Sequence, residues 1–133
     1  MATPVIRFRI DFADDSNVGP GKIGLLEAIR ASGSLSQAAR DLGMSYRRAW
    51  LLVDSLKSAF SEPVTVAATG GKGGGGVVLT KFGERLVAAY RALESEFAAL
   101  AARRLQGVSS AVTRRSAPQA ARRRPLARKN PSR

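Results

Sequence analysis

Two short stretches of the chain carry residues whose types and spacing suit binding chemistry. The first is TGGKGGGGVV, residues 69–78, in which six glycines surround Lys72. A nucleotide-binding loop requires a glycine five residues before its Gly-Lys pair and a Ser or Thr directly after it. Val66 and Gly73 occupy those positions, and a β-branched run follows where a phosphate loop would enter a helix. We therefore interpret the stretch as a hairpin tip whose Lys72 and exposed N–H groups contact phosphates of a DNA backbone.

The second stretch is SYRRAW, residues 45–50, at the beginning of a helical pattern. Arginine binds guanine through two hydrogen bonds or holds phosphate, and serine and tyrosine commonly bond phosphate. Two alternatives stay open: a solvated face for the two arginines, and core packing for the tryptophan. Asp54 repels phosphate, so contact should stop about two turns into the helix. The candidate DNA-contacting residues are Ser34, Ser45, Tyr46, Arg47, Arg48, Trp50, Lys72 and Gly73.

Catalytic and metal chemistry find little support in the composition. The chain has no cysteine and no histidine, which excludes thiolate zinc sites, cysteine nucleophiles and histidine-based triads. Its acidic residues are scattered along amphipathic helices. We expect no enzyme activity, no metal site and no cofactor.

The charge of the chain indicates a polyanionic partner. The net charge is +12, from 22 basic and 10 acidic residues, and residues 107–133 contain eight basic residues and no acidic ones. Residues 1–106 therefore carry 14 basic against 10 acidic residues, a net charge of +4. Such a field favours double-stranded DNA, although solubility alone is an alternative. No run approaches the roughly 18 apolar residues of a membrane span, so we expect a cytoplasmic protein without a membrane partner.

The hydrophobic pattern predicts the elements that position these residues. Residues 5–12 alternate as in a half-buried strand, and a turn should follow. A helix should end at Gly33, a second should begin with a Ser34–Gln37 capping box, and a third should be capped by Ser45. Ala39 should let the last two helices cross, Gly43 should form the turn between them, and the shared core should contain Leu42, Met44, Ala49, Leu52, Val53 and Leu56.

The second half of the domain should be a hairpin followed by a long helix. Two β-branched runs flank the glycines, and Thr80 should cap a helix over residues 81–105. Residues 107–133 are rich in Ser, Ala, Pro and Arg, which predicts a disordered basic tail after a domain of residues 1–106. The predicted fold is mostly α with a small β-hairpin wing.

The long helix carries a heptad seam, which predicts a homodimer. Its length, roughly 37 Å at about 1.5 Å per residue, exceeds what one small core needs. Packing within the monomer is the alternative for Phe82, Leu86 and Tyr90. A dimer would place two recognition helices about 34 Å apart, which predicts a palindromic DNA site. The seam consists of Leu86, Tyr90, Leu93, Phe97 and Leu100.

The run GSLSQAARDLGMSYRRAWLLVDSL, followed by TGGKGGGGVVLTKFGERLVAAY, resembles the N-terminal domain of the ModE molybdate-responsive regulators, which is related to the LysR type. The resemblance covers roughly residues 5–100. It implies a winged helix-turn-helix domain with residues 45–48 on the recognition helix and residues 70–76 at the wing tip. It further implies a dimeric regulator of genes for molybdate uptake or molybdoenzymes.

The sequence departs from that family after residue 106, where a basic tail stands in place of the molybdate-binding region. A separate sensor protein is therefore an expected partner if molybdate is sensed. A protein-interaction module, or an architectural DNA-binding module without effector sensing, is the alternative function.

Overall fold

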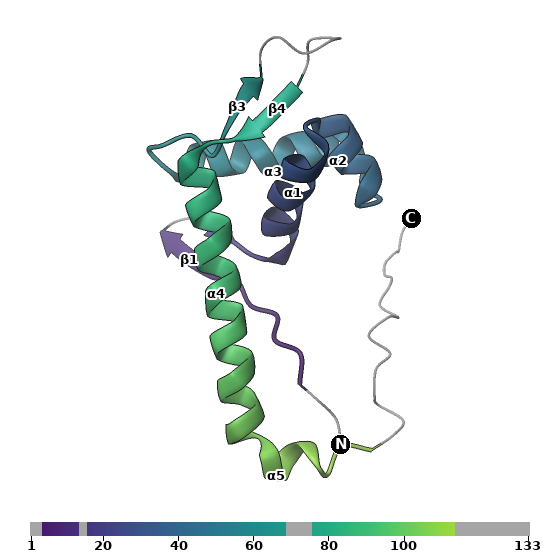
Figure 1. Ribbon diagram of the computed structural model, residues 1–133, viewed down its shortest axis with the longest axis vertical. Coiled ribbons are helices and arrows are strands. Elements are labelled where there is room, and N and C mark those ends of the chain that lie inside the picture. The colour runs from purple at the N-terminus through teal and green to yellow at the C-terminus, as the bar shows by residue number, and fades with distance from the viewer. Residues whose placement is uncertain (1–3, 14–15, 69–75, 114–133) are drawn as a thin grey trace. The chain divides into compact units, whose positions relative to one another are not determined.

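The computed structural model describes residues 4–13, 16–68 and 76–113. Residues 7–95 form one compact unit, and residues 96–113 belong to a second. Two antiparallel hairpins accompany a mostly helical chain (Figure 1). The elements are β1 (Ile10–Ala13), β2 (Ser16–Val18), α1 (Pro20–Ser32), α2 (Leu35–Asp41), α3 (Tyr46–Ala59), β3 (Thr65–Ala68), β4 (Gly76–Leu79), α4 (Lys81–Arg104) and α5 (Gln106–Ser109).

The N-terminal segment differs from the single strand and turn predicted for it. The strand β1 begins only at Ile10 and pairs with β2, which the sequence pattern had assigned to a turn. Because β2 has three residues, it can pair with only a short stretch of the preceding chain. Phe12, the last apolar residue of the alternating stretch, is 52% exposed. The predicted strand is therefore confirmed only over residues 10–12, and the pattern did not identify the partner strand.

Helix α1 is the central element of the compact unit because both of its flanks are buried. Ile23 and Leu26 join a cluster with Leu56, Val64, Val87 and Tyr90. Leu25 and Ile29 join a second cluster with Ala38, Ala39 and Ala49. The predicted end of the helix is confirmed, since Gly33 has a φ of 75°, a left-handed conformation that favours glycine.

The two helices α2 and α3 are joined by a tight turn as the sequence predicts. Gly43 has a φ of 69°, and the buried Ala39 packs in the same cluster as Ala49 of α3. The prediction that Leu42 belongs to this core is wrong, because Leu42 lies in the turn and is 43% exposed.

Side-chain caps begin both helices. The Ser34 Oγ accepts the Gln37 backbone N–H at 3.0 Å, and the Ser45 Oγ accepts the Arg48 backbone N–H at 3.0 Å. The reciprocal half of the predicted capping box is absent among the described contacts. The Gln37 amide instead donates to Asp41, and the Ser34 N–H donates to the Ser32 hydroxyl.

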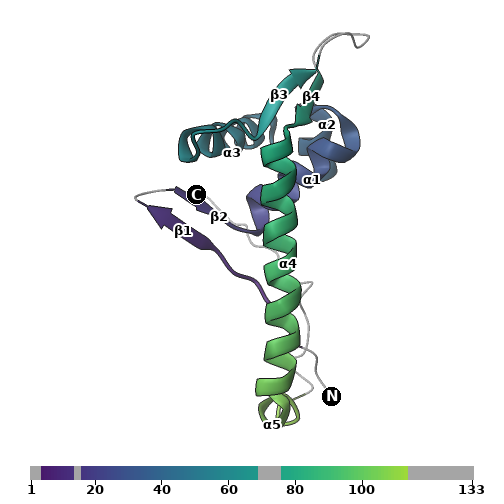
Figure 2. The same cartoon turned by 60° about the vertical axis from the view of Figure 1, so that its left-hand side comes forward.

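The second hairpin is held against the end of α1. The strands β3 and β4 pair from Thr65–Leu79 to Ala68–Gly76, and the Val77 N–H donates to the Gly33 carbonyl at 3.0 Å. Figures 1 and 2 show this hairpin beside α2 and α3, with the first turns of α4 below it. The bond to Gly33 ties the hairpin to the turn that leads into α2, and so fixes the two relative to each other.

Helix α4 begins where predicted and the chain stays helical slightly further than predicted. The Thr80 hydroxyl accepts the Gly83 N–H at 2.9 Å, as expected of a cap. The predicted tail would begin at Gly107, but that residue lies within α5. Local backbone hydrogen bonds sustain this turn, including one from Ser109 N–H to the Leu105 carbonyl. Residues 114–133 of the predicted tail lie outside the described residues.

Candidate nucleic-acid interface

The first two turns of α3 present a continuous exposed face. Ala49 and Leu56 are buried, and Leu52 and Val53 pack against the same cluster as Ala49, so this side of the helix faces the core and the opposite side of its first two turns faces outward. Tyr46 is 56% exposed and Trp50 is 49% exposed, while Arg47 and Arg48 are also exposed. Core packing, the alternative for Trp50, is therefore excluded.

The charge of the two arginines is not neutralised by any ion pair in the part of the chain that the structure describes. Among the described residues, neither Arg47 nor Arg48 forms an ion pair. They occupy the second and third positions of α3, whose first turn contains no acidic residue. Positive charge at a helix N-terminus opposes the helix dipole and costs about 0.3–1 kcal/mol at exposed positions. Helix stability therefore does not explain these arginines, and their position leaves both side chains accessible to an anion.

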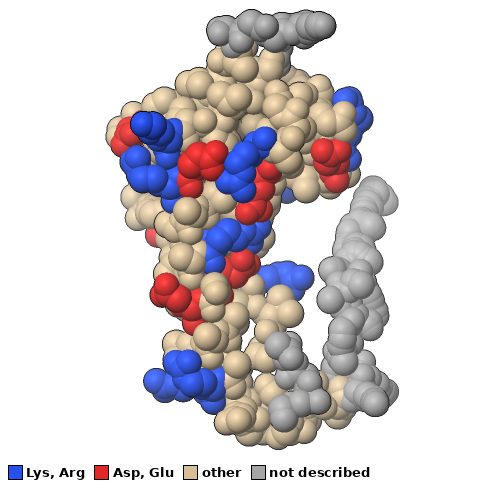
Figure 3. Space-filling view, viewed as in Figure 1, with Lys and Arg blue, Asp and Glu red and all other residues tan. Residues whose placement is uncertain are grey.

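Several other arginines of the compact unit are paired with carboxylates, although Arg7 and Arg40 form no ion pair among the described residues. Arg91 bonds Glu27 at 2.6 Å, and Arg30 bonds Glu84 at 2.7 Å. Both pairs join α4 to α1. In Figure 3, basic and acidic side chains alternate along this part of α4. The face along α4 is therefore electrically mixed, in contrast to the first turn of α3.

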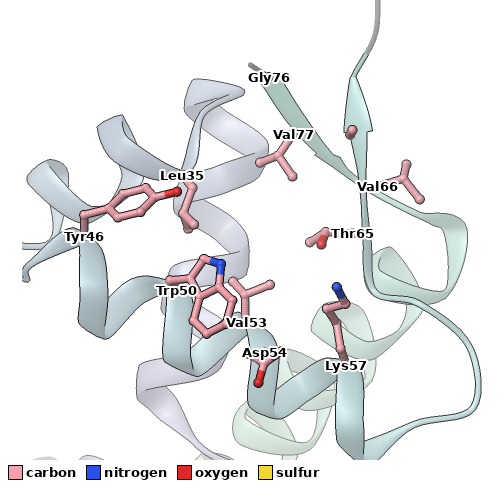
Figure 4. A pocket seen from close by; sticks show the side chains of 11 residues that line it. Leu35, Tyr46, Trp50, Val53, Asp54, Lys57, Thr65, Val66, Gly76 and Val77 are labelled. Carbon is pink, nitrogen blue, oxygen red and sulfur yellow. The ribbon is translucent and has the colours of Figure 1, made fainter. Parts of the chain in front are cut away.

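A groove of about 460 Å³ separates α3 from the β3–β4 hairpin. Figure 4 shows Tyr46 and Trp50 on the α3 side and Val66 and Val77 on the hairpin side. The Lys57 side chain points toward the hairpin, whereas the Asp54 carboxylate points away from it. The side of the groove nearest the hairpin thus carries a cation, although Asp54 also lines the groove.

Three further residues line this groove that the sequence pattern did not indicate: Lys57, Thr65 and Leu35. Lys57 stands seven residues after Trp50, a spacing of two helical turns that places both on one side of α3. The spacing in the sequence could therefore have predicted that Lys57 lies on the same side of α3 as Trp50. Thr65 and Leu35 reach the groove only through the packing of other elements, which no local pattern specifies.

The remaining candidate DNA-contacting residues differ in exposure and in the hydrogen bonds that they already form. Ser45 is exposed and uses its Oγ as the cap acceptor, which leaves its O–H for a donor bond. Ser34 is half-buried and caps α2 in the same way. Lys72 and Gly73 lie outside the described residues, between the two strands β3 and β4.

A buried lysine forms hydrogen bonds that connect α3 to the core of the compact unit. The Lys22 ammonium of α1 donates to the Asn17 carbonyl at 2.9 Å and to the Ser55 hydroxyl of α3 at 2.9 Å. Burial, followed by the positive charge of Arg9, lowers the pKa of Lys22. The lysine joins β2, α1 and α3, and thereby fixes the helix that carries the exposed arginines.

Part of the predicted dimer seam is used within the chain. Tyr90 is 1% exposed, stacks on Phe8 and donates its hydroxyl hydrogen to the Phe8 carbonyl at 2.7 Å. Leu86 packs against the same buried cluster. The prediction that Tyr90 faces a partner is therefore wrong, because the N-terminal segment already covers it. Leu93 is half-buried, and Phe97 and Leu100 are exposed.

The described residues contain no group of three or more acidic, cysteine or histidine side chains placed to hold a metal ion. Over the same residues, no helix has the length and apolar character needed to cross a membrane.

Comparison with known proteins places this chain beside molybdenum-related proteins. It is 47% identical over 85 residues to the molybdenum-pterin-binding protein MopB of Rhodobacter capsulatus, covering 64% of the chain and 32% of MopB. It is 42% identical over 95 residues to the molybdenum transport protein ModE of Azotobacter vinelandii, covering 68% and 35%. It is 46% identical over 71 residues to the DNA-binding transcriptional dual regulator ModE of Escherichia coli K12, covering 53% and 27%.

The chain thus spans about a third of the length of these relatives. No protein-family model matches it.

Proposed function

We propose that this chain is a sequence-specific DNA-binding transcription regulator built as a winged helix-turn-helix. In this account α3 enters the major groove with its N-terminal residues, and the β3–β4 hairpin is the wing beside it. The observation that carries the proposal is the unneutralised pair Arg47 and Arg48 at the exposed beginning of α3. The relative named as a DNA-binding transcriptional regulator supports it.

Each candidate side chain has a distinct role in this account. Arg47 reads guanine through its two parallel donors, and Arg48 holds a phosphate at the edge of the groove. Ser45 and Tyr46 donate to phosphates, and Ser34 does the same at the beginning of α2. Lys72 and Gly73 meet the adjacent backbone or the minor groove. We propose no catalytic role for any residue.

We propose a homodimer formed by α4. Tyr90 and Leu86 pack inside the chain, so the seam we propose is shorter than the heptad pattern predicts and uses Leu93, Phe97 and Leu100. A two-fold arrangement would place the two copies of α3 about one turn of DNA apart, and the preferred site would be palindromic.

The names of the relatives support a proposal for the target genes. Two of them are named for molybdenum pterin binding or molybdenum transport. We propose that this chain regulates genes for molybdate uptake or molybdoenzymes, alone or with a separate sensor protein. Adding molybdate to the binding assay shows whether the chain itself responds.

A second function, docking of another protein, is favoured by one observation. Leu51 and Trp50 on α3 are 47% and 49% exposed, and exposed large apolar side chains are typical of protein interaction sites. The two functions differ in their response to charge: removal of Arg47 and Arg48 weakens DNA binding strongly and apolar docking little.

The test is selection of preferred duplexes from a random library by the full chain, followed by binding of an Arg47→Ala/Arg48→Ala variant. The matched control is Arg103→Ala/Arg104→Ala, which removes an equally adjacent, exposed pair from the last turn of α4. Both variants lose two positive charges. We expect only the α3 variant to lose preference for the selected duplex. If both variants lose that preference equally, the loss is due to the change in net charge and not to the position of Arg47 and Arg48.

A further inference from the structure

Trp50 and Tyr46 are large aromatic residues, and about half of each side chain is exposed to solvent. The chain has one tryptophan and two tyrosines, and the other tyrosine, Tyr90, is fully packed. Among the described residues, neither Trp50 nor Tyr46 stacks on another ring, and neither the indole N–H nor the phenol hydroxyl has a hydrogen-bond partner. Large aromatic rings left unpacked at half exposure are more informative than scattered small apolar side chains.

The two rings adjoin the arginine that we propose reads guanine. Tyr46, Arg47 and Trp50 together surround a shallow hollow on the surface of α3. Tyr46 and Trp50 are four residues apart and Arg47 and Trp50 are three apart, so all three project from neighbouring positions on the first turns. A guanidinium and an aromatic wall therefore face the same small volume.

The guanidinium and the aromatic rings around this hollow suit a guanine with a thymine close to it in the major groove. In the major groove guanine presents two acceptors to an arginine, while thymine presents its 5-methyl group to an apolar contact. Three residues of helix rise about 4.5 Å, and successive base pairs are about 3.4 Å apart. An arginine and an aromatic ring at this spacing therefore reach base pairs that are next to each other or one further apart.

We propose that Trp50, assisted by Tyr46, reads a thymine methyl group within two base pairs of the guanine bound by Arg47. This inference rests on the proposed function and adds a specificity element to it. Trp50 contributes an apolar wall that discriminates thymine from cytosine and uracil, and the positive charge of Arg47 draws the same edge of the duplex toward it. The half-site would therefore contain a thymine close to a G·C pair.

Deoxyuridine provides the test because it differs from thymidine only by the missing methyl. Each thymine of the selected duplex is replaced in turn, and binding of the wild-type chain is measured. We expect one thymine per half-site at which replacement weakens binding about 3- to 5-fold, the value of one buried methyl group. In Trp50→Ala that sensitivity should fall to within a factor of about 1.5, since the methyl no longer has a partner.

Leu51→Ala is the matched control, because Leu51 is equally exposed on α3 and does not line the hollow. It should keep the full deoxyuridine effect. Trp50→Phe, which retains an apolar ring, should keep part of it and guards against a general loss of structure in Trp50→Ala.

The outcomes separate this inference from the proposed function. A deoxyuridine effect that is absent, or that persists unchanged in Trp50→Ala, overturns the methyl contact while sequence preference and its dependence on Arg47 can remain intact. Unchanged DNA binding by Trp50→Ala would likewise overturn the methyl contact. Absence of any preferred duplex would refute the proposed function itself.

Discussion

Replacement of Gly83 by alanine is expected to destabilise the chain although it favours the helix. Gly83 lies in the first turn of α4. A Cβ atom built at this position would overlap the Val64 carbonyl oxygen. That carbonyl cannot easily move aside, because Val64 is fully buried and its oxygen accepts the Thr80 N–H at 3.0 Å.

The magnitude follows from two opposing terms. Alanine gains about 1 kcal/mol over glycine in a helix interior, and less in a first turn. Forcing an atom into a packed site typically costs about 1–3 kcal/mol. If α4 shifts to relieve the overlap, loss of the Thr80 cap adds about 1 kcal/mol. We expect a net destabilisation of about 1–3 kcal/mol.

Gly24→Ala is the matched control. Gly24 lies within α1, and a Cβ atom there would meet nothing within 4 Å. The same substitution should therefore stabilise the chain by about 0.5–1 kcal/mol through helix propensity alone. Urea unfolding followed by circular dichroism compares the two variants with the wild type. A Gly83→Ala variant as stable as the wild type would refute the claim that α4 and Val64 are in direct backbone contact.

Three further predictions concern the ion pairs, the dimer and the tail. The hydrogen bond from Arg91 holds the pKa of the Glu27 carboxyl below its ordinary value of 4.5. The stability that the ionised Glu27 contributes is therefore present above pH 4.5 and is lost as the pH falls through the pKa of the folded state. In an acid titration from about pH 5 downward, followed by the free energy of unfolding, Glu27→Gln should lose less stability than the wild type. We expect the wild type to sediment as the proposed dimer at micromolar concentration and Leu93→Glu to sediment as a monomer. A variant that sediments as a dimer like the wild type would place the seam elsewhere, and a monomeric wild type would refute the proposed dimer. Removal of residues 107–133, which carry eight basic residues and no acidic ones, should weaken binding to all duplexes and flatten its salt dependence while sequence preference survives; loss of preference would show that the tail specifies the site.

The features that the sequence predicted well are those with local causes. Ser34, Ser45 and Thr80 cap helices because each needs only the backbone three residues ahead. Gly33 and Gly43 end or turn the chain because their backbone conformation excludes most other residues. The exposure of the α3 arginines follows from the helical period, which the apolar side of the same helix defines.

The features that the sequence did not predict depend on distant partners. The strand β2 exists because the chain turns back on β1, and three residues without clear alternation give little signal. Tyr90 fits a heptad seam in sequence, yet the segment around Phe8 covers it from 82 residues away. The groove beside α3 likewise needs the hairpin to be held by Gly33, a bond between two segments that are remote in the chain.

The central claim is that the beginning of α3 reads DNA sequence through Arg47 and Arg48. Its most direct test is the ratio of affinities for the selected duplex and a scrambled one, measured at several salt concentrations for the wild type and Arg47→Ala/Arg48→Ala. We expect the wild-type ratio to persist as salt rises, and the variant to bind both duplexes equally with a log–log salt slope smaller by about 0.9, the value of the one phosphate contact assigned to Arg48. A variant that keeps the wild-type ratio and slope would contradict the account.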